Sequence, residues 1–118
     1  MKYLCLVYHI EDELDALPED QYNALVADTL AYDEELRRSG HLISSRVLEY
    51  VQHAATVRVR NGRASVTDGP FAETKEQLGG YILIEARDLD EAISIASKMP
   101  PARTGSIEIR PITELQTR

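Results

Sequence analysis

The hydrophobic pattern of the chain changes from continuous to periodic soon after its start. Residues 2–8 (KYLCLVY) carry apolar side chains at odd and even positions, which is typical of a strand covered on both faces. Residues 18–39 repeat apolar positions at three- and four-residue steps, which predicts an amphipathic helix with Pro18 in its first turn. Gly40 follows the helix, at the position where a residue in the left-handed conformation often ends a helix and glycine is favoured. One member of the stripe is a carboxylate, Asp33, among Tyr22, Leu25, Val26, Thr29, Leu30 and Leu36.

The remaining pattern predicts further strands and a second helix. Asn61-Gly62 separates two β-rich runs and supplies the positive φ angles of a type I′ hairpin turn. Asp88 and Glu91 form a capping box at the start of the second helix, and Pro100 ends it. Strands are expected at 42–48, 55–59, 64–68, 81–86 and 106–110, and the helix at 88–99.

This order of elements predicts the fold class. Strand, helix, two strands, helix, strand is the β-α-β-β-α-β order of a ferredoxin-like α+β domain, here with an extra hairpin. In that fold both helices pack on one face of an antiparallel sheet. The length of 118 residues fits a single domain over 1–118, and 43% hydrophobic residues are enough for a core.

The other face of the predicted sheet has no helix to cover it. We expect the helices to cover Leu4, Leu6, Ile82, Ile84, Ile107 and Ile109. The uncovered face then displays Tyr3, Cys5, Val7, Tyr81, Leu83, Glu85, Glu108 and Arg110. Such an apolar surface seldom stays exposed on a monomer. We therefore expect a homodimer in which two such faces meet through a two-fold axis and enclose a polar-lined cavity.

Charge narrows the range of partners. The net charge is -7, and residues 11–35 contain ten acids and no Lys or Arg. Such a surface repels phosphate backbones and anionic lipids, so nucleic acid binding is not expected. No apolar stretch reaches the ~20 residues of a membrane span, and no signal-peptide profile precedes the first strand, so we expect a cytoplasmic protein. The single cysteine, Cys5, lies in an apolar run and is expected to be a buried, inert thiol.

The loop from Asp68 to Tyr81 is unusual for a surface connection. It combines Asp-Gly-Pro, which forces a tight change of direction, with the pair Gly79-Gly80 directly before a strand. The glycine pair indicates either a backbone that passes close to another group or φ angles that a side chain forbids. Loops that combine rigidity with charge are often functional sites.

This stretch resembles the signature of the DGPF-type branch of the YCII-related family. The similarity extends to MKYLCLVY, ATVRVRNGRASVTDGPF, DLDEA and PARTGSIEIRP, and so covers nearly the whole chain. The resemblance implies a dimeric ferredoxin-like α+β barrel. Some relatives are small-molecule enzymes with a His-Asp pair whose histidine lies on the first helix, one of which removes chloride from a chlorinated muconate. The helix at 18–39 has no histidine. DGPF-type proteins are often encoded beside extracytoplasmic-function sigma factors, which implies a regulatory or ligand-sensing role.

Charged residues of the loop and of the closing segment are the first candidates for a site. Asp68, Glu73 and Glu76 are candidates for a general base; alternatively, Asp68 caps the turn and the glutamates are solvated. Lys75 is a candidate for binding a carboxylate, or it forms surface pairs, and Phe71 is a candidate contact for a ligand. The last candidates are two arginines that either clamp a carboxylate or form ion pairs with Glu85 or Glu108, namely Arg103 and Arg110.

Histidines and tyrosines complete the candidate list. His9, His41 and His53 lie in three separate segments without the spacing of a metal site. His41 is expected at the end of the first helix, whereas His9 or His53 is a candidate acid-base group at the cavity mouth. The phenols of three tyrosines either orient a ligand or lie in the dimer interface: Tyr3, Tyr8 and Tyr81.

Two hypotheses of different classes follow. The first is a homodimeric enzyme with cofactor-free acid-base chemistry, such as isomerisation or elimination, on a small carboxylated compound. Asp68, Tyr81 and either His9 or His53 handle protons in it, and Arg110 anchors the anion. The second is a non-catalytic regulatory module that binds a protein partner through the acidic first helix.

Overall fold

The central strand of the fold is the apolar run at the start of the chain. The computed structural model describes residues 1–118. β1 (Lys2–His9) lies between β5 (Gln77–Glu85) and β6 (Ser106–Pro111), and β2 (Leu42–Val47) lies at the outer edge of β5. All three pairings are antiparallel. The order β2-β5-β1-β6 is that of a ferredoxin-like sheet and confirms the α+β prediction.

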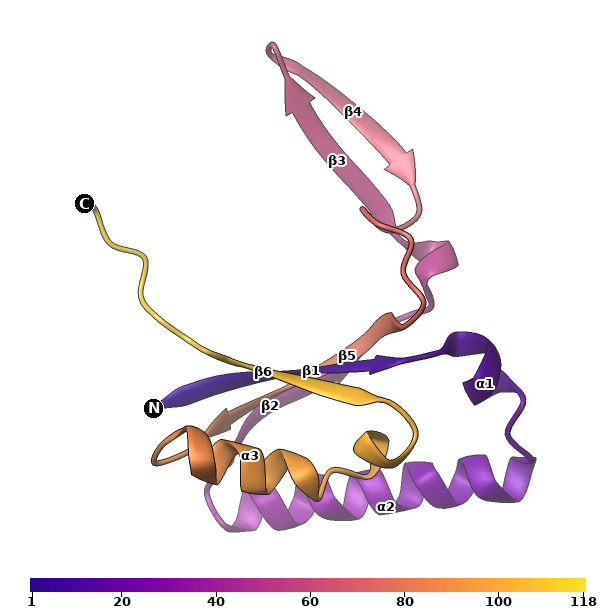
Figure 1. Cartoon of the computed structure of the whole chain (residues 1–118), viewed down its shortest axis with the longest axis vertical. Helices are drawn as coiled ribbons and strands as arrows, with labels where there is room; N and C mark the ends of the chain where they lie inside the picture. Colours follow the sequence, from indigo (N-terminus) through magenta and orange to yellow (C-terminus); the bar gives the residue numbers. More distant parts are fainter.

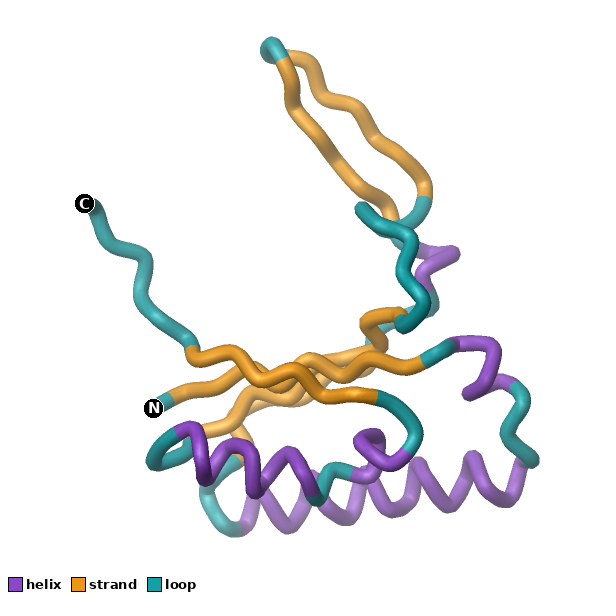
Figure 2. The backbone as a smooth tube through the Cα atoms, in the orientation of Figure 1, coloured by secondary structure: helices purple, strands orange, loops and turns teal.

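Two helices cover one face of this sheet (Figures 1 and 2). α2 (Glu19–Arg38) begins after Pro18, and Ser39 caps its end before Gly40, which has a φ angle of 82°. In α3 (Leu89–Ser97) the Asp88 carboxylate accepts a hydrogen bond from the Glu91 N–H at 2.9 Å, which confirms the predicted cap. The pattern did not reveal α1 (Glu11–Asp15), because one turn of acids has no apolar period to detect.

The core lies between the sheet and these helices. Its sheet side is formed by Ile82 and Ile84 of β5, as predicted, and by Tyr3, Cys5 and Val7 of β1. The expected orientation of β1 was therefore wrong. Leu4 and Leu6 lie on the helix-free face, because Tyr3 pairs with Ile84 and Cys5 with Ile82 across the ladder. Cys5 is fully buried, and burial raises the pKa of its thiol to about 11.

The predicted hairpin is a separate two-stranded arm, not part of the main sheet. β3 (Ala55–Arg60) and β4 (Arg63–Asp68) pair only with each other. Asn61 and Gly62 have φ angles of 52° and 74°, which confirms the type I′ turn. We call residues 55–68 the arm. It rises from the helix-free side of the sheet, as does the chain after β6 (Figure 1).

Two short 3₁₀ turns connect the larger elements. The 3₁₀ turn η1 (Val51–His53) leads into the arm, and η2 (Pro100–Arg103) leads from α3 to β6. β5 begins at Gln77, four residues earlier than the predicted start at Tyr81, so Gly79 and Gly80 belong to the strand. None of the helices combines the length and apolarity that a membrane crossing requires.

Candidate functional site

The first turns of α2 do not pack tightly on the sheet, although they carry the predicted apolar stripe. Leu36 near the end of the helix is 4% exposed, whereas Tyr22 and Val26 in the first turns are 43% and 40% exposed. Between this part of α2 and the sheet lies a groove of about 360 Å³. Its lining is largely aliphatic, with polar groups at a few points. The sheet contributes His9, Ser45 and Gly80 to it, and α2 contributes Tyr22, Val26 and Asp33.

His9, the last residue of β1, is one of the polar groups in the groove. Its ring meets the Tyr50 ring edge-on at a centroid distance of 6.2 Å. The Nε2 atom is buried, and no group of the protein hydrogen-bonds to it. His9 also borders a second cavity of about 170 Å³, formed with Leu14 and Leu17. A buried polar atom without a partner is unfavourable by about 1–3 kcal/mol, so this nitrogen is an available contact for a small molecule in the groove.

The pair Gly79-Gly80 makes room for this arrangement. A Cβ atom on Gly79 would overlap the His9 ring, with Cε1 as its nearest atom. A Cβ atom on Gly80 would lie 2.7 Å from the backbone carbonyl oxygen of Arg46, which is closer than van der Waals contact allows. Neither glycine has a positive φ angle. Of the two explanations that the sequence left open, close approach is therefore the correct one.

Asp33 is the second titratable group in the groove. The Ser45 hydroxyl donates a hydrogen bond to Asp33 Oδ2 at 3.2 Å. Burial raises the pKa of the Asp33 carboxyl above its ordinary value, while the hydrogen bond from Ser45 and the charge of Arg37 act in the opposite direction. The sequence did not predict Asp33 or Ser45 as site residues. One signal for Asp33 was present, because it is the single carboxylate in an otherwise apolar helix stripe.

Other groups shape the rim of the groove. Leu14 of α1 and Thr104 after η2 also border it. The Arg103 guanidinium pairs with Asp28 of α2 at 2.9 Å and ties η2 to the helix. Arg46, on edge strand β2, is also among the bordering residues, but it pairs with Tyr81 in the ladder, so its side chain belongs to the helix-free face. Its guanidinium donates to the Ser45 carbonyl at 2.7 Å.

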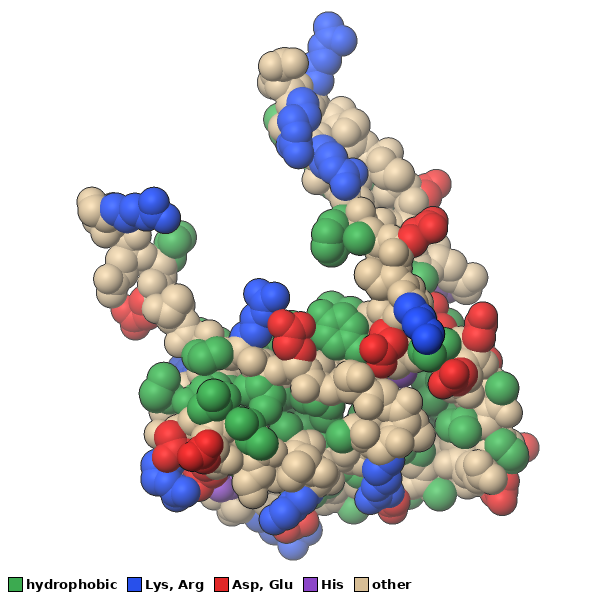
Figure 3. Space-filling model, in the orientation of Figure 1, with side chains coloured by type: hydrophobic (Ala, Val, Ile, Leu, Met, Phe, Trp, Pro, Cys, Tyr) green, Lys and Arg blue, Asp and Glu red, His purple; other side chains and the backbone are tan.

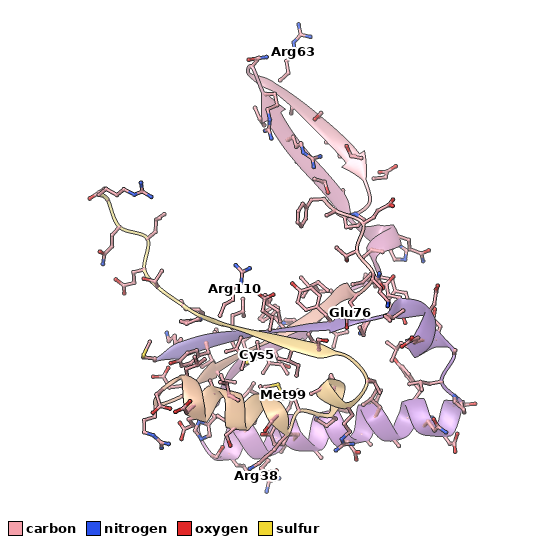
Figure 4. The ribbon with its side chains drawn as sticks, in the orientation of Figure 1. Cys5, Arg38, Arg63, Glu76, Met99 and Arg110 are labelled. Atoms are coloured by element: carbon pink, nitrogen blue, oxygen red, sulfur yellow. The ribbon has the colours of Figure 1, made fainter.

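Of the predicted site residues, only His9 and Tyr81 border the groove. Tyr81 is half-buried on β5, opposite Leu6 in the ladder, so its side chain belongs to the helix-free face. Arg110 extends from that same face (Figure 4) and pairs with Glu108 at 2.9 Å. Arg103 pairs with Asp28 at the surface, as described above. The predicted residues at the arm or in its flanking segments lie outside the groove: His53, Asp68, Phe71, Glu73 and Lys75.

Comparison with known proteins agrees with this fold. The pattern of the YCII-related domain matches residues 1–116. The chain belongs to the YCII-related family. It is 38% identical over 114 residues to an uncharacterized protein of Rhizobium meliloti, a match that covers 95% of this chain and 92% of the relative.

A solved structure is also similar to this YCII-related chain. It is the 5-chloro-2-hydroxyhydroquinone dehydrochlorinase of Burkholderia phenoliruptrix in complex with 2,5-dihydroxybenzoquinone. The TM-score is 0.57 at 16% identity, over 96% of this chain and 94% of the other. At this level of identity the likeness concerns the fold.

Proposed function

We propose that this YCII-related protein is a cofactor-free acid-base enzyme, of isomerase or lyase type, that binds a small carboxylated compound in the groove. The observation that carries the proposal is the buried Nε2 atom of His9, which has no partner within the chain. It lies in the same groove as Asp33, a carboxyl whose pKa is raised by burial. An imidazole and a carboxyl with unequal environments are a suitable pair for proton transfer.

The proposed reaction needs only proton movements. His9 Nε2 accepts a proton from a carbon next to the substrate carboxylate, and the released electron pair forms a carbon-carbon double bond. In an elimination, a leaving group departs with its bonding pair from the neighbouring carbon. In an isomerisation the substrate already has a neighbouring carbon-carbon double bond; this bond breaks, and its electron pair takes up the proton at its far carbon. Asp33 is the second group that gives or takes a proton.

The structural neighbour supports a small-molecule function for this fold. That enzyme was solved with 2,5-dihydroxybenzoquinone bound, a compact ring compound with polar groups at its edge. The groove described above is largely aliphatic with a few polar groups, and its volume of about 360 Å³ lies within the range of small-molecule sites.

We further propose that the protein is a cytoplasmic homodimer of the DGPF-type branch. The helix-free face of the sheet supports the dimer, because its apolar residues are only half-buried in one chain. We call this surface the open face; it consists of Leu4, Leu6, Tyr8, Tyr81 and Leu83. The Asp68–Tyr81 motif supports the branch assignment.

The groove is tested by ligand-induced thermal shift with cis,cis-muconate and 2,5-dihydroxybenzoate as probes. We expect a rise in Tm for the wild type and for the control His53→Gln, whose side chain is exposed outside the groove. His9→Gln and Asp33→Asn should lose it. At a probe concentration of 100 Kd the rise corresponds to about 2.7 kcal/mol. An equal rise in all four proteins would place the binding site elsewhere.

The acidic surface favours a second function, a regulatory module that binds a basic protein partner, such as a sigma factor. Of the ten acids between residues 11 and 35, only Asp28 and Glu34 form ion pairs with arginine. Glu11, Asp15 and Asp33 accept hydrogen bonds within the chain, and the other five carboxylates are exposed to a partner. Charge reversal at Glu19 and Asp20, which are exposed on the first turn of α2, should abolish capture of such a partner. The idea fails if the reversed variant captures the same protein equally well.

A further inference from the structure

The arm has two chemically different faces. In its ladder Val57 pairs with Val66 and Val59 with Ala64, so strand alternation places all four on one face. The opposite face carries Thr56, Arg58, Arg60, Arg63, Ser65 and Thr67. An amphipathic two-stranded ribbon of this kind is stabilised when its apolar face packs against another surface.

Nothing in the same chain covers the apolar face. The three valines of the arm are between 58% and 67% exposed, and β3 and β4 pack extensively only on each other. Phe71, three residues after the arm, is also largely exposed, at 81%. A lone two-stranded ribbon is at best marginally stable in water. The arm therefore requires a partner surface.

Position and charge identify that surface as a second copy of the chain. The arm rises from the same side of the sheet as the open face (Figure 1), so two sheets that meet through their open faces bring each arm alongside the other body. Arg58, Arg60 and Arg63 form no ion pair within their own chain, whose net charge is -7. Figure 3 shows basic side chains gathered toward the tip of the arm, while acids border the sheet and the helices below.

We propose that the arm is an intersubunit arm, which lays its valine face on the body of the second copy and keeps its arginines on the outward face, where their charge attracts the acidic second copy at long range. Apolar burial supplies the affinity, and the opposite charges orient the contact. This inference rests on the proposed homodimer but adds to it. The open faces alone do not complete the interface, and residues 55–68 of each chain belong to it.

The experiment measures the dimer dissociation constant by analytical ultracentrifugation. The test variant is Val57→Thr, Val59→Thr and Val66→Thr together, which retains β-forming, nearly isosteric side chains. Its matched control is Thr56→Ser, Ser65→Thr and Thr67→Ser on the opposite face. We expect the valine variant to raise Kd at least about tenfold, equivalent to about 1.4 kcal/mol, and the control to leave Kd within about twofold of wild type.

A second variant tests the charges. Arg58→Gln, Arg60→Gln and Arg63→Gln together should weaken the dimer at low salt and reduce the dependence of Kd on ionic strength. The inference is overturned if wild type is monomeric, or if the valine variant dimerises as tightly as wild type. In the second case the homodimer itself stands. Because no arm residue borders the groove, the probe-induced thermal shifts report on the proposed function independently of the arm.

Discussion

The two ends of α2 pack differently against the rest of the molecule. At its last turns Leu36 packs into the core with Ala92 and Ala96 of α3 and with Met99; in Figure 4 Cys5 and Met99 both lie between the sheet and the helices. At its first turns the helix borders the groove and leaves Tyr22 and Val26 partly exposed. One end is close-packed, and the other encloses the candidate site.

The difference follows from side-chain size and polarity. Alanines on α3 allow the helix layer to approach the sheet closely, and apolar contacts exclude water there. At the other end, His9, Asp33 and Ser45 line the groove. Polar groups resist complete burial unless they are hydrogen-bonded. The comparison teaches that stability is concentrated at one end of the layer, while the other end retains polar groups that line the groove.

The largest expected effect is at the packed end. Ile84 is fully buried, so Ile84→Ala should lower the free energy of unfolding by about 3–4 kcal/mol through lost burial and a residual cavity. The comparison substitution beside the groove, Leu30→Ala, should lower the free energy of unfolding by less than about 1 kcal/mol. Urea denaturation of both variants checks the comparison. Equal losses would show that the groove end is as tightly packed as the core.

Gly79→Ala should come next, with a loss of about 1–3 kcal/mol from overpacking. The added Cβ meets the His9 ring rather than backbone, so the ring moves while the sheet remains, and probe binding in the groove is lost. The double variant His9→Ala, Gly79→Ala removes the obstacle. We expect its loss in free energy of unfolding to be smaller than the sum of the losses of the two single variants. A double-mutant cycle of urea denaturation measures this difference. Strict additivity would contradict the contact.

Tyr32→Phe should have a smaller effect, again at the packed end. The Tyr32 hydroxyl donates to the Ile95 carbonyl at 2.8 Å and joins α2 to α3. Its removal should lower the free energy of unfolding by about 1 kcal/mol. The control Tyr22→Phe changes a residue that borders the groove, and it should leave the unfolding midpoint unchanged. A loss from the control as large as that from Tyr32→Phe would remove the distinction between the two ends.

The smallest effect is a pH dependence at Asp33. Because burial raises its folded-state pKa, its contribution to stability is complete below the unfolded-state pKa and is lost as pH rises through the folded-state pKa. Asp33→Asn removes the buried charge and should raise Tm by a few degrees at pH 7. The gain should vanish as the pH falls toward about 4, near the unfolded-state pKa of aspartate. The exposed control Glu35→Gln should show no such trend between these pH values in scanning calorimetry.

Much of the fold was predictable because its signals are local. Asn61-Gly62 specifies its turn, Asp88 specifies a helix start, and the stripe on α2 specifies a helix, each from neighbours in the chain. The helix stripe also contained the one hint of the site, because a carboxylate at an apolar position is out of place unless it has a use. His9 was a candidate, but Asp33 and Ser45 were not.

By itself, the sequence determined the order of elements, the ferredoxin-like class and the membership of a family. Only the tertiary structure decided which face of β1 is buried, because a strand that is apolar at both parities has two equally good orientations until its ladder with β5 selects one. Only the tertiary structure brought His9 into one groove with Asp33 and Ser45. These residues come from a strand end, a helix and an edge strand, which share no sequence periodicity. No pattern along the chain can therefore predict that they lie close together.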